Sequence, residues 1–175
     1  VHILKEHRLS NDEFWRSYEI YDQVLKLSGY PGEILAKISS FIPPGSTLLD
    51  IGAGTGSFAV SLSRKTSRTV AVDPSQYQLQ ILMEKAKKEG LTNIIPLQKE
   101  WKDVKFTEIC ELNNLLSDSP GFDYTLAAYS MFDENIENFL SKMIDVSRKG
   151  IFIVFRADSP DPLNEFAYGP KPKAD

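Results

Sequence analysis

Three glycines at alternate positions, Gly52, Gly54 and Gly56, follow the acidic residue Asp50 and its neighbour Ile51. Glycines in this spacing let the backbone turn sharply after a strand and let a ligand approach the main chain closely, where side chains would block it. The chemistry that such a turn supports is the binding of a nucleotide-like cofactor. A tight strand-to-helix turn can also use glycine for its own geometry, so the triplet alone leaves a purely structural role open.

The spacing of these glycines argues against two common nucleotide sites. A dinucleotide fingerprint is Gly-x-Gly-x-x-Gly, whereas here Ser57 follows Gly56 and the pattern is Gly-x-Gly-x-Gly. A phosphate-cradling loop ends in Gly-Lys-Ser or Gly-Lys-Thr, and no lysine stands next to Gly56. A nucleoside triphosphate is therefore not the expected ligand.

A second acidic residue, Asp73, ends the next apolar run, 23 residues after Asp50. A carboxylate at the carboxyl end of a second strand can accept hydrogen bonds from both hydroxyls of a ribose. The structural alternative is that Asp73 caps a helix that begins with Pro74. Together with the glycine turn, Asp73 favours the ribose interpretation.

At this point the chain resembles the class I methyltransferases that use S-adenosylmethionine, whose first motif is an acid followed by Gly-x-Gly-x-Gly. The run from Leu48 to Gly56 (LLDIGAGTG) matches that motif. The resemblance implies that the main chain of the glycine turn packs against the methionine and ribose parts of S-adenosyl-L-methionine, and that S-adenosyl-L-homocysteine is the product. It also implies that Asp50 orients the turn and the cofactor's ammonium group, while a role in capping backbone amides remains the alternative.

Other candidate site residues follow from the same resemblance. Glu100 and Trp101 come after the third strand, where the family contacts adenine; Asp103 is an alternative polar contact, and a partly buried surface aromatic is the alternative for Trp101. The expected cofactor-binding residues are Asp50, Ile51, Gly52, Ala53, Gly54, Gly56, Asp73, Pro74, Glu100, Trp101 and Tyr129. Candidates for contact with the acceptor are Tyr129 and Ser130, and candidates for a lid are Trp15, Tyr21 and Tyr30.

The expected reaction is direct displacement of a methyl group, which depends on positioning and exclusion of water and needs no catalytic triad. Enzymes that methylate base amines typically carry Asn or Asp before Pro-Pro and an aromatic residue after the fourth strand, and the segment 127–132 does not. The net charge of −4 also argues against nucleic acid. A small-molecule acceptor is therefore expected, with no metal. The alternatives are a non-catalytic cofactor-binding scaffold and an NAD-dependent oxidoreductase.

Alternating helical and strand patterns predict the α/β class: a doubly wound, mostly parallel sheet of order 3-2-1-4-5. The expected strands are 47–51, 69–73, 94–98, 122–129 and 151–155. The expected helices are 10–28, one after Pro31, 56–65, one from Ser75 to Gly90, 104–116, and one capped by Asp133 and ended by Gly150. The last of these is expected to bury Ile136, Phe139, Leu140, Met143 and Ile144.

The domain organisation follows from these patterns: a helical cap or lid over 1–42, a cofactor-binding domain over 43–158 and an irregular tail over 159–175. The family usually adds an antiparallel strand pair, which we expect to be missing here, so that the chain is truncated and strand five is an exposed edge. The single cysteine, Cys110, indicates a reducing compartment such as the cytoplasm, and no apolar run is long enough for a membrane span.

Overall fold

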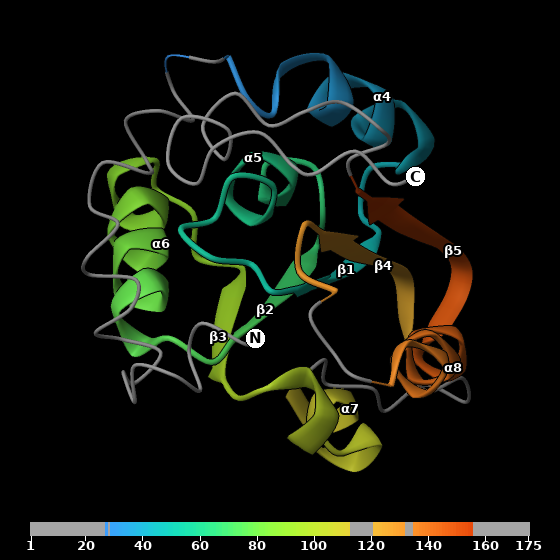
Figure 1. The fold of residues 1–175 in the computed structure, drawn as a ribbon. Helices are drawn as coiled ribbons and strands as arrows, with labels where there is room; N and C mark the ends of the chain where they lie inside the picture. Colours follow the sequence, from blue (N-terminus) through green and yellow to red (C-terminus); the bar gives the residue numbers. More distant parts are fainter. Residues whose placement is uncertain (1–26, 28, 113–120, 132–134, 156–175) are drawn as a thin grey trace, which may run out of the picture.

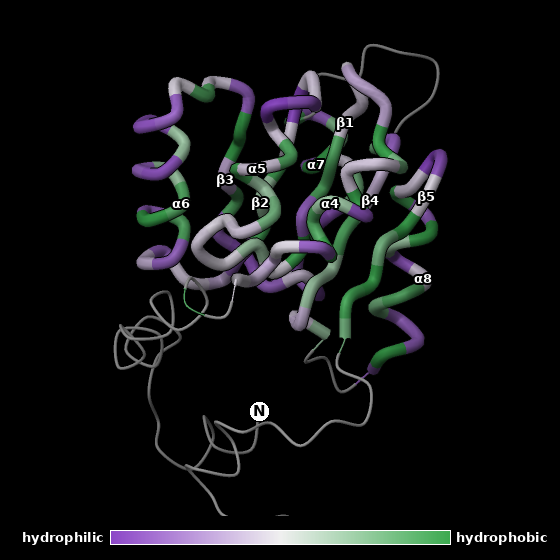
Figure 2. Tube along the Cα trace, turned by 90° about the horizontal axis from the view of Figure 1, so that it is seen from above, coloured by the Kyte–Doolittle hydropathy of each residue, from purple (hydrophilic) through white to green (hydrophobic). Residues whose placement is uncertain are grey.

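A five-stranded parallel sheet forms the centre of the molecule in the computed structural model, which describes residues 27, 29–112, 121–131 and 135–155 (Figure 1). Figure 2 shows the strands side by side in the order β3-β2-β1-β4-β5. The strands are β1 (Thr47–Ile51), β2 (Arg68–Asp73), β3 (Ile94–Gln98), β4 (Phe122–Ala128) and β5 (Ser147–Val154). All neighbouring pairs run parallel. The predicted fold class and strand order are confirmed.

Helices cover both faces of the sheet. They are α4 (Gly32–Phe41), α5 (Ala59–Ser63), α6 (Gln76–Lys88), α7 (Phe106–Leu112) and α8 (Ile136–Val146), with a short 3₁₀ turn, η1 (Trp101–Asp103). Figure 1 shows α4, α5 and α6 on one side and α7 and α8 on the other. The cores agree with this arrangement, because Leu48 packs with residues of α4 and α5, whereas Leu49 packs with residues of α7 and α8.

The strand order places a change of direction beside β1. The chain proceeds outward from β1 through β2 to β3 and then returns to β4 on the other side of β1. The helices that leave β1 and β4 therefore diverge, which opens a crevice at the carboxyl ends of these strands. Because all strands are parallel, the ends of β1, β2, β3 and β4 meet at this one edge, and the glycine turn and Asp73 lie there.

Three details of the last helix and strand were predicted wrongly. Helix α8 ends at Val146, and Gly150 lies inside β5 instead of stopping the helix. The cap is Asn135, whose side chain accepts a hydrogen bond from the backbone N–H of Asn138, and not Asp133, which lies outside the described residues. Two of the residues expected inward are exposed, Ile136 by 40% and Ile144 by 61%, because the buried stripe is narrower and centred on Phe139 and Met143.

Several predictions fall on parts of the chain that the structure does not describe: the helix over 10–28, the residues Trp15 and Tyr21, and the tail over 159–175. The boundaries at 42/43 and 158/159 stay predictions. Within the described ranges, β5 has a strand partner on one side, β4, and Ile153 and Phe155 beside this edge are exposed by 37% and 67%. No helix of the described residues combines the length and apolar character needed to cross a membrane.

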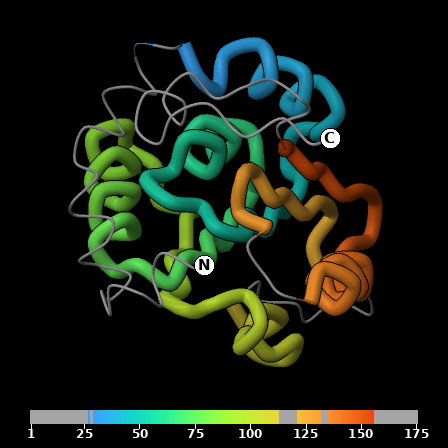
Figure 3. The backbone as a smooth tube through the Cα atoms, in the orientation of Figure 1, coloured from blue at the N-terminus to red at the C-terminus, as the bar shows by residue number. Residues whose placement is uncertain are grey.

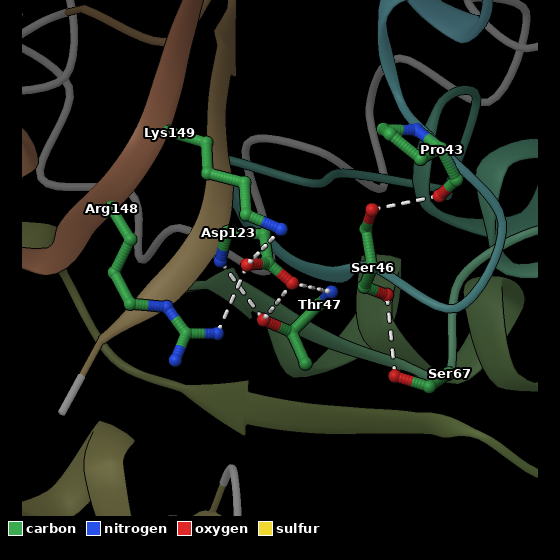
Figure 4. A network of polar contacts seen from close by, with 7 residues as sticks. All are labelled: Pro43, Ser46, Thr47, Ser67, Asp123, Arg148 and Lys149. Carbon is green, nitrogen blue, oxygen red and sulfur yellow. Dashed lines mark hydrogen bonds and ion pairs between the residues drawn. The ribbon is translucent and has the colours of Figure 1, made fainter. Parts of the chain in front are cut away.

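A polar network ties β1, β4 and β5 together at the amino ends of the strands, away from the glycine turn (Figure 4). The Asp123 carboxylate accepts a hydrogen bond from the Thr47 backbone N–H at 2.9 Å and pairs with Arg148 at 3.1 Å and with Lys149 at 3.0 Å. Burial raises the pKa of Asp123, but the Thr47 hydrogen bond and the two cations lower it more, so that it lies below its ordinary value. The network therefore stabilises the fold with an ionised carboxylate.

Replacing this carboxylate, Asp123→Asn, is expected to lower the free energy of unfolding at pH 7 by about 1–3 kcal/mol, since two cations lose their charged partner. Because the pKa of Asp123 is lower in the folded chain, its charge stabilises the fold at pH values above the unfolded pKa. This stabilisation is lost as the pH falls through the folded-state pKa. Urea unfolding from pH 7 to pH 3 should therefore show the wild type and the variant converging in acid. Asp145→Asn, at an exposed position of α8, is the control. A stability difference between the wild type and Asp123→Asn that grows in acid would contradict the ionised state of Asp123.

Candidate cofactor-binding site

The glycine turn connects β1 to α5 and is held against β2 by its own backbone. The N–H groups of Gly52 and Ala53 both donate to the carbonyl oxygen of Val72, at 2.8 and 3.0 Å. The three glycines have φ values of +70°, +54° and +86°, in the left-handed region where a side chain is strained. The turn therefore requires glycine for its backbone conformation alone.

Packing adds a second requirement for glycine. A Cβ on Gly52 would lie 2.2 Å from Ser130 Cβ, and one on Gly54 would lie 2.7 Å from Gln78 Oε1. A Cβ on Gly56 would lie 2.7 Å from Leu82 Cγ. In Figure 3 the teal trace of the turn lies between green α6 and the orange end of β4, which carry these neighbours. The three glycines are therefore needed for the geometry of the turn itself. This structural role is compatible with a role in cofactor binding.

Ser130 has a defined structural task at the end of β4. Its hydroxyl donates a hydrogen bond of 2.6 Å to the carbonyl oxygen of Ile51, the last residue of β1. The contact of its Cβ with Gly52 is part of the same packing. Ser130 thus fastens the start of the glycine turn to β4, and its proton is engaged in this bond.

Asp73 binds the glycine turn directly. Its Oδ2 accepts a hydrogen bond of 2.9 Å from the Gly54 N–H, and its Oδ1 accepts one of 2.9 Å from the Ser75 N–H. The helix-capping role belongs to Ser75 instead, whose Oγ accepts from the N–H of Gln78 at the start of α6. A carboxylate can accept several hydrogen bonds at once, so its bonds to the turn do not exclude hydrogen bonds from the hydroxyls of a ligand.

Asp50 lies near the end of β1, just before the glycine turn, and is 2% exposed. Burial raises the pKa of its carboxyl to about 7, the backbone hydrogen bond of Ala59 opposes this rise, and the negative charge of Asp73 adds to it. The role of Asp50 in holding backbone amides, the alternative to a cofactor contact, is compatible with this effect of Ala59. Because the pKa is raised from 3.8 to about 7, the stability of the fold depends on pH between these two values.

The segment after β3 was expected to contact adenine. Glu100 is exposed and pairs with Lys102 at 2.5 Å. Trp101 is 6% exposed: its ring packs against Phe139 with centroids 6.2 Å apart, and Lys142 Nζ lies 4.6 Å from its centroid. The ring of Trp101 therefore packs in the core between η1 and α8 and is more deeply buried than the surface aromatic of the alternative. Its contact with adenine stays a prediction.

Two tyrosines meet beside the glycine turn. Tyr129, just after β4, has a φ of +54°, the one non-glycine residue of the described ranges in the left-handed region. Its side chain is 39% exposed, and its ring lies 5.7 Å from that of Tyr30, which in turn packs on Phe58 at 5.8 Å. The structure thus brings one lid candidate, Tyr30, together with the acceptor candidate Tyr129. Strained residues of this kind concentrate at binding and catalytic sites.

Gln78 is a further residue at the turn, and the motifs of the sequence did not indicate it. It lies on the buried face of α6 with Leu79, Leu82 and Ala86, and its side chain reaches the glycine turn at Gly54. The feature of the sequence that could have indicated it is a polar residue within the apolar stripe of a predicted helix.

These features define a Rossmann-like parallel sheet with a glycine turn at its switch point. A family model described as a methyltransferase domain matches residues 48–150, more than half of the chain. The chain therefore belongs to the methyltransferase domain family, as the resemblance of the glycine motif implied.

Two relatives support this assignment. An uncharacterized protein of Haemophilus influenzae is 27% identical over 128 residues, which is 73% of this chain and 43% of that protein. Phosphoethanolamine N-methyltransferase 3 of Arabidopsis thaliana is 27% identical over 164 residues, covering 86% of this chain and 31% of that protein. The chain thus spans less than half the length of either relative.

Solved structures share the fold at low identity. Coclaurine N-methyltransferase bound to N-methylheliamine and S-adenosylhomocysteine has a TM-score of 0.56 and 19% identity, over 69% of this chain and 34% of that one. YcgJ of Bacillus subtilis has a TM-score of 0.55 and 19% identity, over 76% and 55%. Trm5b of Pyrococcus abyssi has a TM-score of 0.52 and 16% identity, over 66% and 30%. These similarities show the fold alone.

Proposed function

We propose that this chain binds S-adenosyl-L-methionine on the glycine turn and transfers its methyl group to a small molecule by direct displacement. The observation that carries the proposal is the Asp73 carboxylate, which accepts a hydrogen bond from Gly54 of the turn at the carboxyl edge of the sheet. Membership of the methyltransferase domain family supports it.

The residues present fit this cofactor. Gly52 and Gly54 are partly exposed, and with no Cβ they allow close approach to the main chain. The residues proposed to hold the cofactor are Asp50, Ile51, Gly52, Ala53, Gly54, Gly56, Asp73, Pro74, Glu100, Trp101 and Tyr129. When bound, the sulfonium group supplies an electrophilic methyl. The protein's part is then to position the acceptor in line and to exclude water, which needs no protein nucleophile.

A small-molecule acceptor is the finer part of the proposal. Two of the similar proteins are named as N-methyltransferases of small molecules, coclaurine and phosphoethanolamine, whereas another similar structure is a tRNA m1G37 methyltransferase of M. jannaschii. The acidic net charge of the chain favours the first group. The partly exposed pair Tyr30 and Tyr129 offers aromatic surface for such an acceptor beside the turn.

Asp73→Ala tests the cofactor assignment. Isothermal titration of the whole chain with S-adenosylmethionine should show affinity reduced about tenfold to a hundredfold, since two charge-assisted hydrogen bonds to ribose would be lost. Asp145→Ala, at an exposed position on α8, should leave the affinity unchanged. A wild-type chain that binds NAD and not S-adenosylmethionine would overturn the proposal. Equal affinities of Asp73→Ala and wild type would exclude the ribose contact.

A further inference from the structure

Gln78 carries a buried side-chain amide on α6. Gln78 is 6% exposed and shares its helix face with the apolar residues Leu79, Leu82 and Ala86. Its backbone N–H donates to Ser75 Oγ. Within the part of the chain that the structure describes, we find no hydrogen bond to its side-chain oxygen or nitrogen.

This amide points at the glycine turn. Gln78 Oε1 lies 2.7 Å from the position that a Cβ on Gly54 would take. The N–H of the same glycine donates to Asp73 Oδ2. Gly54 is therefore contacted from two elements, by Asp73 at the end of β2 and by Gln78 in the first turns of α6.

A buried amide costs free energy when its donors and acceptor are unsatisfied. A side chain such as methionine would fill the same space between Leu79 and Leu82 without this cost. An amide in this place is explained when a polar ligand group completes its hydrogen bonds. It offers one acceptor and two donors, which suits a ribose hydroxyl or the edge of adenine, both of which combine donors and acceptors.

We infer that Gln78 is a cofactor-contacting residue, which hydrogen bonds to the nucleoside part of the cofactor beside Asp73. This inference rests on the proposed function and adds a specificity-determining residue to it. The nucleoside part is favoured over the methionine part because Gln78 and Asp73, the residue proposed to bind the ribose, both contact Gly54. Gln78 thereby helps to select an adenosine-type ligand.

The test compares Gln78→Met with Gln80→Met, which makes the same change at an exposed position of the same helix. Isothermal titration of the whole chain uses S-adenosylhomocysteine and 5′-methylthioadenosine, which lacks the amino-acid part. We expect Gln78→Met to weaken both ligands by about tenfold and Gln80→Met to weaken neither. Equal loss for the two variants, or no loss for Gln78→Met, would overturn the inference.

A second measurement needs no variant. In a chain labelled with ¹⁵N at glutamine side chains, saturating S-adenosylhomocysteine should shift the two Gln78 amide proton resonances and slow their exchange with water. Unchanged Gln78 resonances in a chain that binds the ligand would overturn the inference and leave the proposed function intact. A wild-type chain that binds neither ligand would instead overturn the proposed function, so the two failures are distinguishable.

Discussion

Asp50→Asn is expected to raise the melting temperature of the chain at pH 8 by several degrees. The folded-state pKa of Asp50 is raised from 3.8 to about 7, chiefly by burial. Between these values the folded chain keeps a proton that the unfolded chain has released, so the wild type loses stability as the pH rises from about 4 to about 7. At pH 8 the buried charge costs as much as about 4 kcal/mol, and asparagine removes it.

The measurement is thermal unfolding of both chains from pH 4 to pH 8. The stability difference should be small at pH 4, grow up to about pH 7 and then stay constant. Asp145→Asn removes an exposed carboxylate and should show no such growth. A difference that is flat across this range, or one that grows in acid, would show that Asp50 is not the titrating group.

The same substitution should weaken the proposed cofactor binding, because asparagine cannot supply a charge to an ammonium group. Asp50 and Asp73 are both buried acids at neighbouring strand ends, and the charge of Asp73 itself raises the pKa of Asp50. A cationic ligand group nearby would favour the ionised form of Asp50. A more stable variant with weaker binding would be the usual trade-off between stability and function.

The sheet could be predicted from the sequence because its strands are continuous apolar runs at regular intervals. The expected ranges of β1 and β3 are identical to those observed, since polar or turn residues bound each run. The β5 prediction failed at Gly150, which sequence patterns treat as a helix stop. In the structure Gly150 lies opposite Tyr124, where a Cβ would be 3.2 Å from the tyrosine ring. That requirement is created by tertiary packing and has no local signature.

The site shows the same division between local and tertiary information. The glycine turn and Asp73 could be found because strand ends and turn residues are local patterns. The packing of Trp101 could not be predicted, because an aromatic residue after a strand suits either a ligand or the core, and its partners Phe139 and Lys142 lie on α8. Gln78 was missed because its meaning depends on the neighbouring loop, which sequence spacing does not show.

Gly52→Ala is expected to be the most destabilising single substitution in the turn. A side chain at a φ of +70° costs about 1–2 kcal/mol, and a Cβ at 2.2 Å from Ser130 Cβ adds an overlap that typically costs about 1–3 kcal/mol. The overlap would also displace Ser130 from its hydrogen bond to Ile51. We therefore expect a loss of about 2–5 kcal/mol in the free energy of unfolding.

Gly90→Ala is a matched control for this prediction. Gly90 has nearly the same φ, +68°, but a Cβ there would meet nothing within 4 Å. Gly90→Ala should therefore show the backbone cost alone. The difference between the two variants in the free energy of unfolding, measured with urea, gives the cost of the overlap with Ser130. The double variant Gly52→Ala with Ser130→Gly removes the overlapping Cβ and should recover part of that difference. Equal destabilisation by Gly52→Ala and Gly90→Ala would mean that the turn relaxes freely, and the turn would then not be the rigid cradle that the site requires.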